Sequence, residues 1–121
     1  MTIKEVSELT GLTSYTLRYY EKEGILQEIK RDDSGYRKYS QKDIDILRFL
    51  NCLKKAEMSV KEIKEFASLL YRGESTVEAR IDLLQKQEAK VKIMLHDIQE
   101  AYNHINWKIT YYKEQLLTQE N

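Results

Sequence analysis

Apolar positions in the C-terminal part of the chain recur at alternating intervals of four and three residues. Only Glu88 interrupts the series. A seven-residue repeat lines one side of an α-helix, so the pattern is typical of a coiled coil and predicts one long helix over about residues 76–118. The seam positions are Val77, Ile81, Leu84, Val91, Leu95, Ile98, Tyr102, Ile105, Ile109, Tyr112 and Leu116.

This apolar seam needs a partner helix. No glycine or proline follows Gly73, which disfavours a hairpin in which the helix folds back on itself. The simplest partner is the same segment of a second chain, related by a two-fold axis. We therefore predict that residues 74–121 form a coiled-coil dimerisation helix and that the chain is a homodimer, with the intramolecular hairpin as the alternative.

The N-terminal part reads as two short helices joined by a tight turn. Thr2 and Glu5 have the spacing of a capping box at the start of the first helix. Gly11 predicts the turn, and Thr13 is a good N-cap for a second helix that ends before Gly24. Helix, short turn with glycine, and helix is the arrangement of a helix-turn-helix, although other all-α proteins also contain it.

One face of the second helix is basic and aromatic, because Tyr15, Arg18, Tyr19 and Lys22 fall at helical spacing. An arginine can donate two hydrogen bonds to a guanine edge or a phosphate, and tyrosine hydroxyls bind phosphate oxygens. This face therefore favours DNA recognition. Tyr20 lies toward the other side, where we expect it to pack on the first helix.

The next stretch predicts a β-hairpin with its turn at residues 32–35. A two-stranded hairpin is marginal in water, so we expect it to pack on the helices as the wing of a winged helix does. Its cations suit a phosphate clamp beside the DNA groove, with an ordinary solvated hairpin as the alternative. These cations and the tyrosines between them are Lys30, Arg31, Tyr36, Arg37, Lys38 and Tyr39.

Two further helices complete the predicted head. Ser40 is expected to cap a helix over residues 41–53, whose apolar contacts include Phe49, and Ser59 begins a capping box for a fourth helix. The sequence thus predicts a mainly α-helical protein, with a winged helix-turn-helix DNA-binding domain over residues 1–73.

Composition narrows the functional classes. The chain carries 20 Lys+Arg and 20 Asp+Glu, so the interpretation as a DNA-binding protein rests on pattern and not on net charge. No apolar run approaches the roughly 18 residues of a membrane span, and the N-terminus lacks an export signal. We expect a soluble cytoplasmic protein without a membrane partner.

Catalytic and metal-binding patterns are missing from the sequence. It has one cysteine, Cys52, and two histidines, His96 and His104, that lack a third ligand at suitable spacing. It shows no nucleophile–base pair and no phosphate-binding glycine loop. We therefore expect no enzyme activity, no cofactor and no bound metal.

The motifs of the helix and hairpin resemble the signature of the MerR family of transcription regulators. The matching residues are Thr16, Leu17, Arg18, Tyr19, Tyr20, Glu21, Gly24, Arg31, Ser34, Gly35, Tyr36, Arg37 and Tyr39. The family usually has a proline after the recognition helix, where this chain has Gln27 and Glu28. In that family the long C-terminal helix forms an antiparallel dimeric coiled coil.

The resemblance implies both a site and a mechanism. Such dimers bind a near-palindromic promoter operator and distort it in response to an effector, so that RNA polymerase can use promoter elements that are otherwise misaligned. It implies DNA-contacting or wing-shaping roles for positions on both elements. These are Arg18, Tyr19, Tyr20, Arg31, Tyr36, Arg37 and Tyr39.

The place of Cys52 resembles the single-cysteine, AdhR/NmlR-like branch, which is associated with aldehydes, other electrophiles and nitrosative stress. Arg48 and Lys55 lie near it on the predicted helix and favour a thiolate, whereas the helix C-terminus opposes one. An inert core cysteine is the alternative. For the whole chain, the alternatives are an effector-independent DNA-binding repressor and a coiled-coil protein-interaction scaffold.

Overall fold

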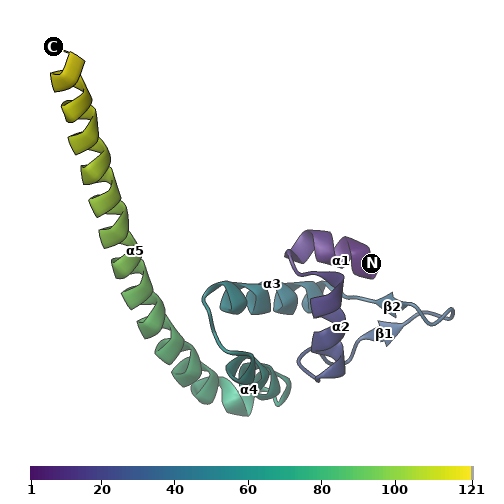
Figure 1. Cartoon of the computed structure of the whole chain (residues 1–121). Coiled ribbons are helices and arrows are strands. Elements are labelled where there is room, and N and C mark those ends of the chain that lie inside the picture. The colour runs from purple at the N-terminus through teal and green to yellow at the C-terminus, as the bar shows by residue number, and fades with distance from the viewer. Residues whose placement is uncertain (121) are drawn as a thin grey trace. The chain divides into compact units, whose positions relative to one another are not determined.

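The computed structural model describes residues 1–120, which divide into a compact head, residues 1–84, and a second unit from Gln85 onward. The chain is mainly α-helical with one small hairpin, as predicted (Figure 1). In order, the elements are α1 (Ile3–Thr10), α2 (Ser14–Lys22), β1 (Lys30–Arg31), β2 (Arg37–Lys38), α3 (Gln41–Lys55), α4 (Val60–Tyr71), the 3-10 turn η1 (Glu74–Thr76) and α5 (Val77–Glu120).

The helices of the head begin at the capping residues that the sequence indicates. The Thr2 hydroxyl accepts a hydrogen bond from the Glu5 amide at 3.2 Å, which confirms the N-cap of α1. At α3, Ser40 and Asp43 form a complete reciprocal capping box, where the sequence predicted only the serine cap. An N-cap of this kind contributes about 1 kcal/mol, because it satisfies amides that the helix itself cannot pair.

The turn between α1 and α2 is fixed from outside by α3. Gly11 adopts φ 77°, the left-handed conformation that favours glycine. The Asn51 side-chain amide donates to the Thr10 carbonyl at 2.9 Å, so α3 binds the end of α1 directly. A Cβ on Gly11 would lie 3.1 Å from Asn51 Nδ2, so a larger residue would require the Asn51 side chain to shift. Leu12 fills the corner and is buried.

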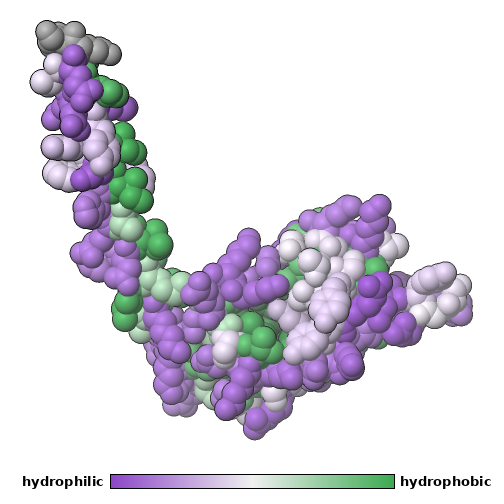
Figure 2. Space-filling view, viewed as in Figure 1, coloured by the Kyte–Doolittle hydropathy of each residue, from purple (hydrophilic) through white to green (hydrophobic). Residues whose placement is uncertain are grey.

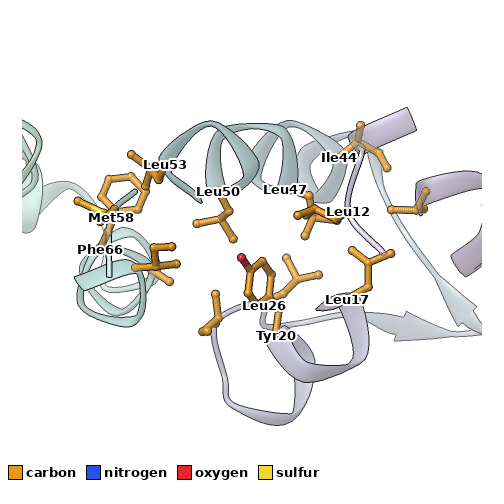
Figure 3. Close-up of a cluster of buried hydrophobic side chains, with 14 of the residues drawn as sticks. Leu12, Leu17, Tyr20, Leu26, Ile44, Leu47, Leu50, Leu53, Met58 and Phe66 are labelled. Atoms are coloured by element: carbon orange, nitrogen blue, oxygen red, sulfur yellow. The ribbon is translucent and has the colours of Figure 1, made fainter. Parts of the chain in front are cut away.

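One hydrophobic core joins the helices of the head. In Figure 3, Leu50 projects from α3 toward Tyr20 of α2, and Ile44, Leu47 and Leu17 belong to the same buried cluster. Phe49 was predicted as an apolar contact; it is 38% exposed, with its ring 5.3 Å from that of Phe66. The buried core residues are Val6, Leu12, Leu17, Tyr20, Ile25, Leu26, Tyr39, Ile44, Leu47, Leu50, Leu53, Met58, Ile63, Phe66, Ala67 and Leu83.

Helix α5 leaves most of its predicted seam exposed. Apolar side chains line the helix in Figure 2, and Ile98 is 69% exposed. Leu84 differs from its neighbours on the seam, because it is partly buried against the core of the head. Val91 is also only partly exposed. Among the described residues, no helix combines the length and apolar character that crossing a membrane requires.

Candidate nucleic-acid interface

The basic and aromatic face of α2 is open to a ligand. Tyr15 is 79% exposed, and Arg18 and Lys22 are exposed beside it. Tyr19 is only partly exposed and packs against the core. Tyr20 is buried, and burial raises the pKa of its phenol. Tyr20 is therefore a core residue in this structure, although the family resemblance included it among possible DNA contacts.

The hairpin forms as predicted, with Lys30 paired to Lys38 and Arg31 paired to Arg37. Its turn is held by one carboxylate, since Asp32 Oδ1 accepts from the amides of Ser34 at 2.9 Å and Tyr36 at 3.0 Å. Tyr36 itself is 73% exposed. The wing therefore offers an aromatic tip on a turn that its own side chains organise.

Glu21 of α2 holds both strands of the wing. Its Oε1 atom lies 3.4 Å from Arg31 Nη2, and its Oε2 atom accepts a hydrogen bond from Arg37 Nε. This hydrogen bond raises the pKa of the Arg37 guanidinium. Arg31 also donates to the Gly35 carbonyl at 2.8 Å. The two arginines, predicted as phosphate contacts, thus bind the protein in this structure.

Glu21 has no role of its own in the sequence pattern. It belongs to the quoted motif, but a glutamate in the last turn of a helix is an ordinary surface residue by pattern alone. Only the hairpin register, which brings Arg31 and Arg37 side by side, reveals its function. By contrast, Lys30 and Lys38 are exposed and form no ion pair with any of the described residues.

Tyr39 lies inside the head and not on its surface. Its side chain is 5% exposed, and its hydroxyl lacks a hydrogen-bond partner among residues 1–120. Burial raises the pKa of the phenol, and the positive charge of Arg37 opposes part of that increase. Tyr39 can therefore shape the base of the wing, but it cannot touch DNA in this conformation.

A concavity of about 1030 Å³ separates the wing from the start of α1. Thr2 lies on one wall, and Arg18 and Tyr36 also line it. Arg31, Arg37 and Lys38 line it as well, together with the carboxylates of Glu5 and Asp32. The concavity therefore lies between two parts of the candidate interface and carries charges of both signs.

The stretch that departs from the family pattern has its own stabilising contact. The Gln27 amide donates to the Tyr71 hydroxyl at 3.1 Å, and burial raises the pKa of that phenol. A proline at position 27 could not donate this bond, because it has no amide hydrogen. Gln27 also caps the preceding turn, since its side chain donates to the Gly24 carbonyl at 2.9 Å.

Cys52 is exposed on α3, so the expectation of a core position for this residue is wrong, and its reactivity stays a prediction. Arg48 and Lys55 are exposed on the same helix. Within the described residues there is no group of three or more His, Cys, Asp and Glu side chains able to hold a metal ion. His96 lies 3.2 Å from Glu100, one turn further along α5.

Comparison with known proteins assigns the family. The chain matches the model of the MerR HTH family of regulatory proteins over residues 1–70. This chain belongs to the MerR family. It is therefore a DNA-binding transcriptional regulator, and its curated relatives are transcriptional regulators as well.

Two relatives of this MerR regulator are informative. An HTH-type transcriptional regulator of Haemophilus influenzae is 35% identical over 113 residues, which cover 93% of this chain and 84% of that protein. AdhR of Bacillus subtilis is 38% identical over 91 residues, or 75% of this chain and 65% of that protein. The second match thus spans just under two thirds of its relative.

Two solved structures resemble the whole MerR-type chain. A MerR family regulator from Listeria monocytogenes has a TM-score of 0.88 and 34% identity, with 99% of this chain and 91% of that chain covered. HiNmlR, described as a MerR family regulator lacking the sensor domain and bound to promoter DNA, has a TM-score of 0.83 and 35% identity. That match covers 93% of this chain and 90% of HiNmlR.

Proposed function

We propose that the chain acts as a homodimer that binds a palindromic promoter operator and distorts the duplex to activate transcription by RNA polymerase. The observation that carries this proposal is the exposed Tyr15, Arg18 and Lys22 face, which lies in the same compact unit as a cationic wing. HiNmlR, which matches most of this chain, is bound to promoter DNA. MerR regulators are dimeric and act on RNA polymerase.

The two parts of the chain have different tasks in this proposal. Residues 1–73 bind DNA, and residues 74–121 hold two heads at a fixed spacing through an antiparallel coiled coil. Dimerisation is supported by the exposed apolar seam of α5, because a helix with such a seam gains stability when a second helix covers it. A two-fold dimer in turn requires a near-palindromic operator.

Arg18→Ala tests the recognition face. If Arg18 reads a base, we expect operator affinity to fall by about 1–3 kcal/mol, measured by fluorescence anisotropy on DNA from the promoter nearest the gene. Arg72→Ala is the matched control, because Arg72 is an exposed arginine at the end of α4. A loss under a few tenths of a kcal/mol for Arg18→Ala would show that α2 presents a different face.

The same measurement at several salt concentrations tests the scaffold alternative. Phosphate contacts make affinity fall steeply as salt rises, since cations released from DNA must be bound again. A coiled-coil scaffold that binds only protein would not bind DNA with an affinity that depends on salt in this way. The expected result is therefore a linear decrease of log affinity with log salt.

We also propose that Cys52 senses aldehydes or related electrophiles. Its exposure on α3 and the match to AdhR support this function, because a sensor thiol must be reached by its effector. The Cys52 sulfur would add to the carbonyl carbon of an aldehyde, and the thiol proton would pass to the carbonyl oxygen to give a hemithioacetal. Modification of Cys52 on α3 would then change how the DNA-bound head distorts the operator.

In vitro transcription with wild type and Cys52→Ser, with and without an aldehyde, tests the sensor. Activation that needs both the aldehyde and the thiol is the expected result. Equal induction of both proteins would overturn the thiol assignment. Aldehyde-independent repression by both would identify the effector-independent repressor instead.

A further inference from the structure

One carboxylate connects the recognition helix with both strands of the wing. Glu21 in α2 binds Arg31 of β1 and Arg37 of β2, which face each other in the hairpin register. The Glu21 and Arg37 side chains are only 24% and 26% exposed, so this contact is partly shielded from water. Arg31 is 49% exposed, so its contact with Glu21 is less shielded from water.

The wing depends on such an anchor because its strands are very short. Each strand has two residues, and a hairpin of that length does not hold a fixed position without side-chain contacts. Arg31 adds a second constraint by donating to the Gly35 carbonyl in the turn. The Glu21 carboxylate thus fixes the strands, and through Arg31 the turn, relative to α2.

The same contacts divide the four cations of the wing into two classes. Arg31 and Arg37 share the single carboxylate of Glu21, which offsets one of their two positive charges. Lys30 and Lys38 are paired across the hairpin, are exposed and have no ion-pair partner in the part of the chain that the structure describes. Lys38 also lines the concavity beside the start of α1. The lysines can bind a phosphate with no competing ion pair within the protein, whereas the arginines already share a carboxylate.

We propose that Glu21 is a positioning residue that sets the spacing between the recognition helix and the wing, and that Lys30 and Lys38, not Arg31 and Arg37, contact phosphates. This inference rests on the proposed binding of operator DNA. It departs from the expectation from sequence, in which the hairpin pattern made all four wing cations a phosphate clamp and the family resemblance gave Arg31 and Arg37 a DNA-contacting or wing-shaping role. The arginines hold the wing to α2 through Glu21, and the lysines contact the DNA.

Salt dependence of operator binding separates the two classes. Each phosphate contact contributes about 0.9 to the slope of log affinity against log salt. A dimer contains each lysine twice, so the loss of one lysine type removes about 1.8 from the slope. We expect Lys30→Gln and Lys38→Gln each to lower the slope by that amount. Arg37→Gln and Arg31→Gln should lower affinity with the slope unchanged, because they misplace the wing without removing a phosphate contact.

Glu21→Gln tests the anchor in the full-length chain. We expect operator affinity to fall at least fivefold, with loss of hydroxyl-radical protection at the operator flanks and retention of the central protection from α2. Glu23→Gln is the matched control, since it removes the same charge two residues away from a carboxylate that binds Lys64 at 3.2 Å. It should stay within twofold of wild type.

The outcomes are distinguishable. Unchanged or tighter operator binding by Glu21→Gln would overturn the positioning role, and a reduced salt slope for the arginine variants would overturn the division of the cations. If Glu21→Gln does not fold, the comparison of Arg37→Gln with Lys38→Gln still decides the proposal. A wild-type chain without salt-dependent operator binding would instead overturn the proposed function itself.

Discussion

The head and helix α5 use the same kinds of apolar residue at the same helical spacing, with opposite outcomes. In the head, Leu47 and Leu50 of α3 are completely buried by neighbouring helices of the same chain. In α5, Ile98 and Ile105 are 69% and 62% exposed. Two helices with similar sequence patterns therefore differ in where their apolar faces find a partner.

This difference shows what an amphipathic pattern determines. It determines that a face will be covered, since fully burying a leucine or isoleucine is worth about 1.5–3 kcal/mol. It does not determine whether the cover comes from the same chain or from another one. The elements of the head enclose their own core, whereas most of the seam of α5 is exposed in the single chain, and we propose that a second chain covers it.

The largest predicted effect comes from a charge in the seam. Ile98→Glu should raise the dissociation constant of the dimer by about 100-fold or more, because each chain would bury an unpaired carboxylate at a cost of about 3–5 kcal/mol. Sedimentation equilibrium measures this change, and operator binding at low protein concentration should fall with it.

Gln99→Glu is the control for that variant. It adds the same charge one residue further along α5, at an exposed position outside the seam. It should dimerise like wild type. Equal weakening by both substitutions would mean that total charge, and not burial of Ile98, governs association.

A smaller effect is predicted in the head. Leu47→Ala removes a completely buried side chain from the centre of the core and should lower the free energy of unfolding by about 2–5 kcal/mol. Urea denaturation at fixed protomer concentration measures it. Leu9→Ala is the matched control, because Leu9 is 45% exposed on α1, and should cost under about 1 kcal/mol. A similar cost at both positions would contradict the described core.

Much of the fold was predictable because its signals are local. The Thr2 cap, the turn at Gly11 and the hairpin around Asp32 each depend on residues close in sequence, and the structure confirms all three. The long helix was predictable from its repeat alone. Leu84 shows the limit of that repeat, since a residue on the seam register also reaches the core of the head.

The candidate site was less predictable because its details are tertiary. The pattern placed Arg31 and Arg37 among exposed cations, but their state depends on Glu21, which approaches from another element. In the same way, Tyr39 alternates with exposed wing residues in the sequence but lies among core residues in space. Contacts between elements decide both cases, and a linear pattern does not contain them.

Alkaline pH should act on the head through its buried phenols. Burial raises the pKa of Tyr20, Tyr39 and Tyr71 above the ordinary value of 10.0. Below that pH the phenols are neutral in both states; above it the unfolded chain loses protons first, so the free energy of unfolding falls as pH rises. Each tyrosine contributes up to about 1.4 kcal/mol per pH unit. Urea denaturation between pH 9 and about 11 checks the decrease, and a flat profile would contradict it.

Tyr39→Phe gives the smallest predicted change and the sharpest test of that residue. The Tyr39 hydroxyl is buried and has no hydrogen-bond partner in the described chain, so its removal should leave stability at pH 7 unchanged or raise it by about 1 kcal/mol. The variant should also lose one tyrosine's share of the alkaline decrease, and its operator affinity should stay within about twofold of wild type. Tyr36→Phe is the matched comparison, because Tyr36 is 73% exposed at the tip of the wing. A large loss of operator affinity from Tyr39→Phe alone would show that the wing opens on DNA and presents this hydroxyl to a phosphate.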